Sequence, residues 1–144
     1  MKKALLVVVV ILVFIFTMYG CQNKNLVGSI SIISSEKEYL PESNWINSLE
    51  DGLAGDGMRK APNEVSAGLD EIPLTGDLEI IIDGKTTGNP AYTLFNEDYE
   101  EVYYRNHEFK EPSEPGVYIL LIELAWGNKT RYEGFQYFFK LIKK

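Results

Sequence analysis

Cysteine and histidine are almost absent from this sequence of 144 residues, which contains only Cys21 and His107 of these two types. A lone cysteine has no partner for a disulfide within the chain, so the fold must be stable without one. One cysteine and one histidine also cannot supply the roughly four ligands that a structural zinc ion requires. The HExxH helix of zinc peptidases and the GxSxG turn of serine hydrolases are missing as well. We therefore expect no metal, no cofactor and no enzymatic activity.

Basic residues are scarce relative to acidic ones. The chain has 14 lysines and arginines against 21 aspartates and glutamates, a formal net charge of −7 at pH 7. No basic stripe interrupts this excess, and a polyanion repels the phosphate backbone of nucleic acids. We therefore expect no nucleic-acid partner, and avid binding to anionic lipid headgroups is disfavoured for the same reason.

The N-terminus is the most informative part of the sequence. Lys2 and Lys3 precede an unbroken apolar run, Ala4–Phe16, and a less apolar stretch then leads to Gly20 and Cys21. Two positive charges, an apolar core and a small residue at the cleavage position are typical of a secretory signal peptide. The sequence therefore indicates export of everything that follows.

A cysteine directly after the small residue makes this stretch similar to a bacterial lipoprotein signal, although that pattern usually has leucine at the position of Met18. The resemblance implies cleavage between Gly20 and Cys21 and acylation of Cys21 with fatty acids such as palmitate, which attach the protein to the lipid bilayer. Two acyl chains are what stable attachment requires. An uncleaved transmembrane anchor, for which about 20 apolar residues are needed, and a plain secreted protein remain open as alternatives.

These features divide the chain into a signal peptide (1–20), a polar tether (21–26) and a single domain (27–144). Without Lys2 and Lys3, the exported part has 12 basic and 21 acidic residues, a formal charge of −9. It is long enough for one domain with its own core. The nine tyrosines, seven phenylalanines and two tryptophans of the chain favour a folded domain over a disordered stalk.

Short β-strands are predicted in this domain, because apolar and polar residues alternate between turn-forming residues. The strongest is Val117–Trp126, in which the even positions form one apolar face and Glu123 lies on the other. The closing strand, Arg131–Ile142, alternates in the same way, and the two are expected to form a central hairpin. The other predicted strands are Val27–Ser34, Leu78–Asp83, Ala91–Phe95 and Glu101–Tyr104.

Residues 35–76 show no clear pattern, and we expect them to be irregular, with the core strands following in residues 77–144. Asn44–Leu53 fits either one or two helical turns or a loop that Trp45 pins to the core. We expect Trp45 and Trp126 to be core anchors.

Several short strands at near-regular spacing, with no long amphipathic helix, favour an antiparallel sandwich. We therefore predict an all-β, immunoglobulin-like β-sandwich after an N-terminal hydrophobic signal or anchor helix.

Aromatic residues and turn glycines from Trp45 to the C-terminus resemble a module of Gram-positive bacteria. The resemblance is carried by Asp51-Gly52, Asp56-Gly57, Gly116-Val117-Tyr118, Trp126 and the ending Tyr132-x-Gly134-x-x-Tyr137-x-Phe139. This module occurs outside the membrane, in small lipoproteins and at the C-terminal end of some BlaR-like membrane peptidases. The resemblance implies an extracytoplasmic accessory or sensing module and no protease activity.

Two groups of residues are candidates for chemistry. His107 is the sole histidine available to a hydrolase, but its place where a strand runs into a loop predicts an ordinary exposed side chain. Acidic turns at Asp51 and Asp56, and at residues 96–101, offer oxygen ligands to calcium without the spacing of an EF-hand loop. Solvated surface is the simpler interpretation of both turns.

Tyrosines near the middle strands are the candidate ligand face. Tyr92, Tyr99 and Tyr103, with Phe95 and Tyr104, could make a platform for a glycan or a peptide. We favour the alternative, in which alternate members fill the core and the others cover the outer face of the sheet.

We expect a non-catalytic lipoprotein at the cell membrane, attached through acylated Cys21 and facing the extracytoplasmic side, that binds or steadies another envelope protein. The alternatives are a surface lipoprotein that binds glycan or peptide and, more remotely, a small hydrolase that uses His107.

Overall fold

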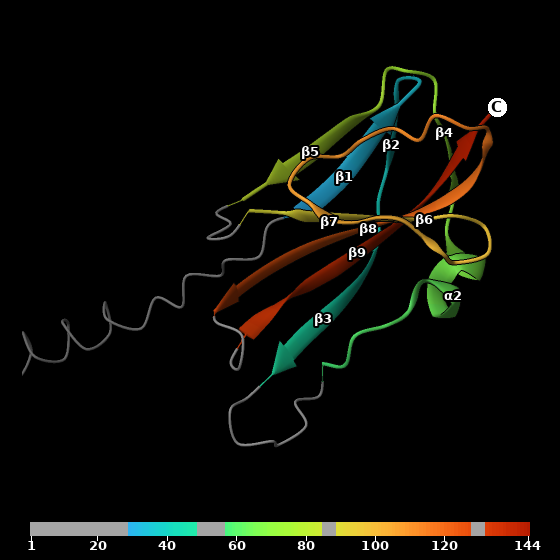
Figure 1. Cartoon of the computed structure of the whole chain (residues 1–144). Helices are drawn as coiled ribbons and strands as arrows, with labels where there is room; N and C mark the ends of the chain where they lie inside the picture. Colours follow the sequence, from blue (N-terminus) through green and yellow to red (C-terminus); the bar gives the residue numbers. More distant parts are fainter. Residues whose placement is uncertain (1–28, 49–56, 85–88, 128–131) are drawn as a thin grey trace, which may run out of the picture.

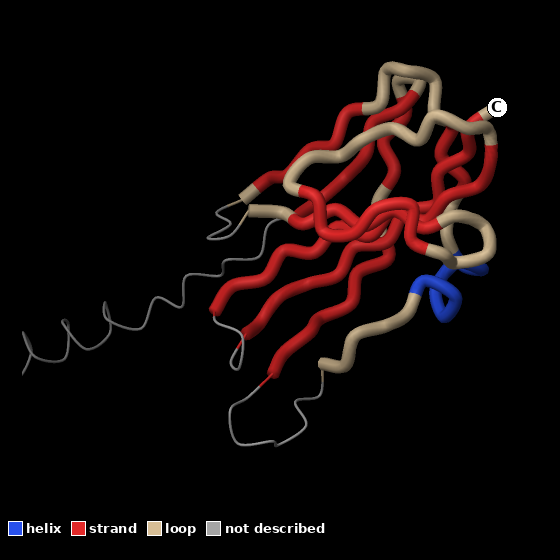
Figure 2. Tube along the Cα trace, viewed as in Figure 1, coloured by secondary structure: helices blue, strands red, loops and turns tan. Residues whose placement is uncertain are grey.

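The computed structural model describes residues 29–48, 57–84, 89–127 and 132–144, which are mostly β-strands (Figures 1 and 2). In chain order the elements are β1 (Ser29–Ser34), β2 (Lys37–Tyr39), β3 (Glu42–Ser48), α2 (Pro62–Val65), the 3-10 helix η1 (Ser66–Gly68), β4 (Glu71–Pro73), β5 (Glu79–Asp83), β6 (Ala91–Phe95), β7 (Glu101–Asn106), β8 (Gly116–Gly127) and β9 (Tyr132–Lys143). No helix among the described residues is long and apolar enough to cross a membrane.

The strands form two sheets. The smaller sheet is antiparallel and has the order β2-β1-β5. The larger sheet has the antiparallel order β3-β9-β8-β6-β7. The short strand β4 pairs in parallel with the end of β9, on the same edge of β9 as β3. The inner faces of the two sheets share one core, so the predicted all-β sandwich is confirmed.

The strands predicted from alternating apolar residues are present. β6 matches its prediction residue for residue, and β8 extends its prediction by one residue at each end. The β8–β9 hairpin runs from Gly116 opposite Lys143 to Gly127 opposite Tyr132, and it lies in the middle of the larger sheet, as predicted.

The prediction that residues 35–76 are irregular is wrong over much of their length. β2, β3, β4 and both short helices fall within this range. Asn44–Ser48, predicted as a helix or a loop, belongs to β3, which pairs with β9 along its whole length. The sequence of β3 does not indicate a strand, because most of its side chains are polar. Its extended conformation results from pairing with β9, which is distant in the sequence.

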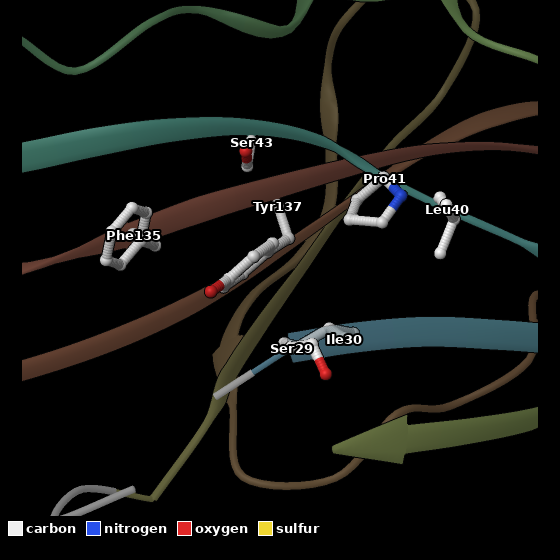
Figure 3. A pocket seen from close by; sticks show the side chains of 7 residues that line it. All are labelled: Ser29, Ile30, Leu40, Pro41, Ser43, Phe135 and Tyr137. Carbon is white, nitrogen blue, oxygen red and sulfur yellow. The ribbon is translucent and has the colours of Figure 1, made fainter. Parts of the chain in front are cut away.

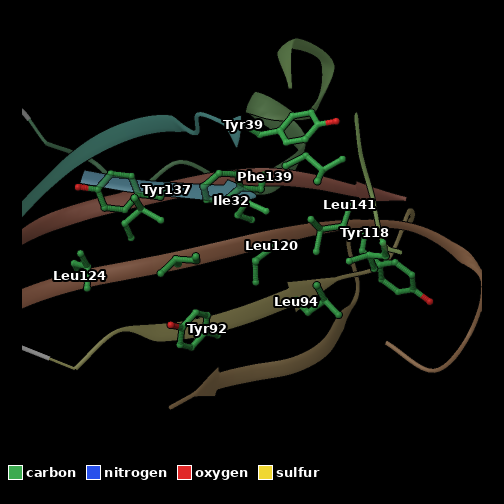
Figure 4. Close-up of a cluster of buried hydrophobic side chains, with 14 residues drawn as sticks. Ile32, Tyr39, Tyr92, Leu94, Tyr118, Leu120, Leu124, Tyr137, Phe139 and Leu141 are labelled. Atoms are coloured by element: carbon green, nitrogen blue, oxygen red, sulfur yellow. The ribbon is translucent and has the colours of Figure 1, made fainter. Parts of the chain in front are cut away.

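The core lies between the two sheets (Figure 4). The even-numbered residues of β8 from Tyr118 to Leu124 all belong to it, as their alternation predicts. Full burial of each aliphatic or aromatic side chain contributes about 1.5–3 kcal/mol. The buried members of this core are Ile30, Ile32, Tyr39, Ile72, Leu74, Tyr92, Leu94, Tyr118, Leu120, Ile122, Leu124, Tyr137, Phe139 and Leu141.

The outer face of the larger sheet is covered by the segment from Gly57 to η1. Gln136 of β9 is 2% exposed and holds this segment by its backbone. Its Oε1 accepts from the Lys60 N–H at 2.9 Å, and its Nε2 donates to the Lys60 carbonyl at 3.4 Å. A second buried cluster lies on the same face and consists of Val65, Ile119, Leu121 and Phe138.

Glu123 lies on this outer face, on the side of β8 opposite the core residues, as predicted. It is 3% exposed, and its carboxylate is ion-paired with the guanidinium groups of Arg59 and Arg105, the latter at 3.4 Å. Because both arginines are partly exposed, their charges stay hydrated while they neutralise the buried carboxylate.

The prediction that Trp45 is a core anchor is wrong, because 40% of its surface is exposed. Trp45 lies opposite Phe135 in the β3–β9 ladder. Figures 1 and 2 show that the long strands of the larger sheet continue past the end of the smaller one. Trp45 therefore lies on the same inner face as Phe135 but is covered incompletely. The side chain of Trp126 lies outside the described residues.

Candidate functional site

An apolar groove opens on one flank of the sandwich, between the start of β1 and the start of β3 (Figure 3). Its volume of about 360 Å³ falls at the lower end of the range of small-ligand pockets, about 300–1,000 Å³. None of its lining residues is charged, and their polar side-chain groups are three hydroxyls. The lining consists of Ser29, Ile30, Leu40, Pro41, Ser43, Phe135 and Tyr137.

Two aromatic residues of β9 form the inner part of the groove. Phe135 and Tyr137 are two positions apart on a strand, so both side chains point to the inner face of the sheet. Their ring centroids lie 5.9 Å apart with 29° between the ring planes. Burial raises the pKa of the Tyr137 hydroxyl above its ordinary value of 10.0, so this group is neutral near pH 7.

The rim of the groove is formed where the chain crosses from one sheet to the other. Leu40 and Pro41 make this crossing between β2 and β3, and the side chain of Leu40 is 76% exposed. Trp45 adds exposed aromatic surface next to Phe135, because directly opposed residues of an antiparallel pair are neighbours on one face. Exposed apolar surface that continues into a concavity is typical of an interaction site.

The candidate tyrosine platform does not form a single surface. Tyr92 is 8% exposed and belongs to the core, and Tyr103 packs against the same cluster. Burial raises the pKa of both hydroxyls. Tyr99 lies in the turn before β7, where its hydroxyl is 2.8 Å from Ser66 Oγ. The alternative interpretation, in which alternate tyrosines fill the core, is confirmed for Tyr92 and Tyr103.

The other candidate residues do not converge on a catalytic or metal site in the part of the chain that is described. His107 is exposed in a bend that directly follows β7, as its sequence context predicts. In the acidic turn, Asn96 Oδ1 accepts from the N–H groups of Asp98 and Glu100 at 3.0 and 2.9 Å, so this side chain shapes the turn itself. Residues 29–48, 57–84, 89–127 and 132–144 contain no group of three or more His, Cys, Asp or Glu side chains able to hold a metal ion.

Four of the candidate residues lie outside the described residues. Gly20 and Cys21, predicted for signal cleavage and lipid attachment, precede Ser29, and Asp51 and Asp56 fall within the range 49–56. Lipid attachment at Cys21 therefore stays a prediction.

The groove is not apparent from the sequence. The alternation of β9 correctly placed Phe135 and Tyr137 on the apolar face, but it could not show which part of that face is left uncovered. That depends on where β2 ends. Pro41 was the available signal, because a proline that follows an apolar residue at the end of a strand terminates the ladder.

No family model, no curated protein and no solved structure matches this chain. What the groove can do therefore follows from its own chemistry. An apolar lining with hydroxyl groups and no charge favours the binding of uncharged, apolar groups.

Proposed function

We propose that the protein is a lipid-anchored, extracytoplasmic binding module that holds or steadies another component of the cell envelope without catalysing a reaction. The observation that carries this proposal is the uncharged apolar groove with Leu40 exposed at its rim. The chain as a whole carries a net charge of −7, so an uncharged concavity of this kind is a distinct feature of its surface. Such a feature is what a binding module needs.

The N-terminal sequence supports the proposed location. Ser29, which lines the groove, follows Cys21 by eight residues. An extended chain of that length spans at most about 29 Å. A domain anchored through Cys21 therefore keeps its groove close to the outer surface of the bilayer, where membrane proteins expose their flanking segments. The likeness to modules of small lipoproteins and BlaR-like peptidases agrees with this location and favours a membrane sensor as the partner.

The two alternative functions have less support. A glycan or peptide site on the middle-strand tyrosines would need Tyr92, Tyr99 and Tyr103 on one face, which they do not share. A small hydrolase would depend on His107 alone, and this side chain is exposed in a bend.

The anchor is tested by the intact mass of the protein purified from membranes. We expect a chain that begins at Cys21 and carries fatty-acyl mass. Cys21→Ser should leave the chain unprocessed and without acyl mass. Recovery of the unmodified chain from Met1, free in the cytosol, would contradict the proposed location.

The binding role is tested by photo-cross-linking in intact cells with benzoylphenylalanine at Leu40 or at Met58. These two side chains are almost equally exposed, at 76% and 77%. Met58 is the matched control, because its carbonyl accepts from Asn44 Nδ2 at 2.8 Å, away from the groove. We expect one discrete cross-linked protein from Leu40 and none from Met58. Equal yields from both positions, or no product from either, would contradict a binding role for the groove.

A further inference from the structure

The pairing of β1 changes halfway along the strand. On one side, β5 pairs with Ser29–Ile33, but on the other side β2 pairs only with Ile32–Ser34. Continuing the β2 register would place Pro41 opposite Ile30. Proline has no N–H to donate to a ladder, and the chain instead crosses to the larger sheet. In the part of the chain that the structure describes, no strand therefore pairs with the β2 side of β1 at residues 29–31.

The apolar groove lies against this open edge. Figure 3 shows Ser29 and Ile30 of β1 on one side of the groove, Ser43 and Pro41 on the other, and the ring of Tyr137 between them. A further strand would lie about 4.8 Å from β1 in the plane of the sheet. Side chains of such a strand that point inward would meet the aromatic lining from β9.

The edge and the groove together select the chemistry of the occupant. An unpaired strand edge presents N–H and C=O groups at the spacing of a β-ladder, which matches the groups of another extended backbone. The groove has no charged lining residue, so the side chain that enters it must be apolar or uncharged. A lipid acyl chain would fill the groove but would leave the hydrogen-bonding groups of the edge unused.

We propose that the groove binds a short extended segment of an envelope protein by strand addition to residues 29–31 of β1, with an apolar side chain of that segment held against Phe135 and Tyr137. This inference rests on the proposed function for the location of the partner, and it adds the mode of recognition. Leu40, which lines the groove and is 76% exposed, would contact the added segment.

The test uses the acylated full chain, labelled with ¹⁵N, in lipid nanodiscs. The probe is the uncharged peptide acetyl-Thr-Val-Thr-Val-Thr-amide, and a second peptide carries N-methyl groups on both valines. We expect the first peptide to shift the amide signals of residues 29–31 and to protect from exchange those whose N–H groups face the open edge, because alternate N–H groups of β1 already face β5. The N-methylated peptide should bind at least about tenfold more weakly, because it cannot complete the ladder.

Two matched variants identify the site. Ser43→Trp fills the groove from an exposed position of β3, and Ser113→Trp makes the same change on an exposed loop away from it. Ser43→Trp should weaken peptide binding at least about tenfold, whereas Ser113→Trp should leave it within about twofold. Equal binding by wild type and Ser43→Trp, or by both peptides, would overturn the proposal.

A lipid occupant is tested in the same nanodiscs with lipids that carry a spin label on the acyl chain. Broadening of the Phe135 and Tyr137 signals without peptide binding would assign the groove to lipid and overturn strand addition. A Leu40 cross-link in cells combined with no peptide binding would keep the binding module and reject this recognition mode. The absence of both the Leu40 cross-link and peptide binding would reject the proposed function as well.

Discussion

The buried side-chain amide of Gln136 hydrogen-bonds to a backbone segment in the way that a neighbouring strand would. Gln136 bonds both the N–H and the C=O of Lys60, and its Oε1 also accepts from Asn44 Nδ2 at 2.9 Å. These bonds fix the segment before α2 to the outer face of the larger sheet. At Lys60, hydrogen bonds from the Gln136 side chain thus take the role that backbone hydrogen bonds have in a β-ladder.

Replacing this amide should be costly. Gln136→Leu retains much of the side-chain volume but removes three part-buried hydrogen bonds to Lys60 and Asn44, a loss of about 1–3 kcal/mol. We expect that loss in the free energy of unfolding measured with urea. Glu133→Leu, at an exposed position of the same strand, should change it by less than about 0.5 kcal/mol. Equal losses from the two variants would mean that the hydrogen bonds to Lys60 contribute nothing specific.

Asp77 gives the protein a pH dependence in acid. A hydrogen bond from the Thr75 hydroxyl lowers the pKa of Asp77 below its ordinary value of 3.8. Desolvation of the carboxylate acts in the opposite direction. A hydrogen bond from the Ser35 N–H, at 3.2 Å, lowers the pKa further. Because the pKa is lower in the folded state, the stabilisation is complete above pH 3.8 and is lost as the pH falls through the folded-state pKa. Asp77→Asn should therefore be less stable than wild type from about pH 5 upwards, and the difference in urea midpoint should close in stronger acid. A difference that stays constant down to the lowest pH would contradict this assignment.

At the scale of elements, prediction from the sequence succeeded where the strand pattern is local. β8 was predictable because its own alternation separates the core residues from Glu123. β3 was not predictable, because Ile46 is the one buried apolar side chain among its described residues and its pairing partners lie in β9, far along the chain. The burial of Glu123 was likewise not predictable, because its ion-pair partner Arg59 comes from a distant segment of the chain. The groove was unpredictable for the same reason: its lining comes from three separate parts of the chain.

Gly134 shows how closely the long strands approach one another. A Cβ at this position would overlap the carbonyl oxygen of Leu124 and lie 2.7 Å from Ala125 Cα, and neither backbone atom can move aside without distorting β8. Gly134→Ala should therefore lower the free energy of unfolding by more than about 2 kcal/mol. Gly68→Ala is the control, because its new Cβ meets only the flexible Glu42 side chain at 3.8 Å, and we expect a change below about 1 kcal/mol. Similar urea curves for the two variants would contradict the tight packing at Gly134.

At the scale of the whole molecule, buried tyrosines make the sandwich sensitive to alkali. Burial raises the pKa values of Tyr92, Tyr103 and Tyr137 above 10.0. The unfolded chain loses these protons first, so the stabilisation is full below pH 10.0 and is lost as the pH rises through the folded-state values. We expect the urea midpoint to fall steeply above about pH 10. Tyr92→Phe should reduce this slope, whereas Tyr104→Phe, at a position that is 61% exposed, should not.

The pairing pattern of β9 has a consequence for biosynthesis. β9 pairs with β8, β3 and β4, and among the described residues it is the strand partner of β3 and β4, so these two strands cannot join the larger sheet before residues 132–143 are available. A nascent chain that has been made only as far as β8 lacks the strand that joins its early and late segments. The larger sheet therefore stays incomplete until synthesis has passed β9, although all the strands of the smaller sheet have been made by then. The proposed export fits this order of events, because a polypeptide threaded through a narrow translocation pore must stay unfolded until it has passed.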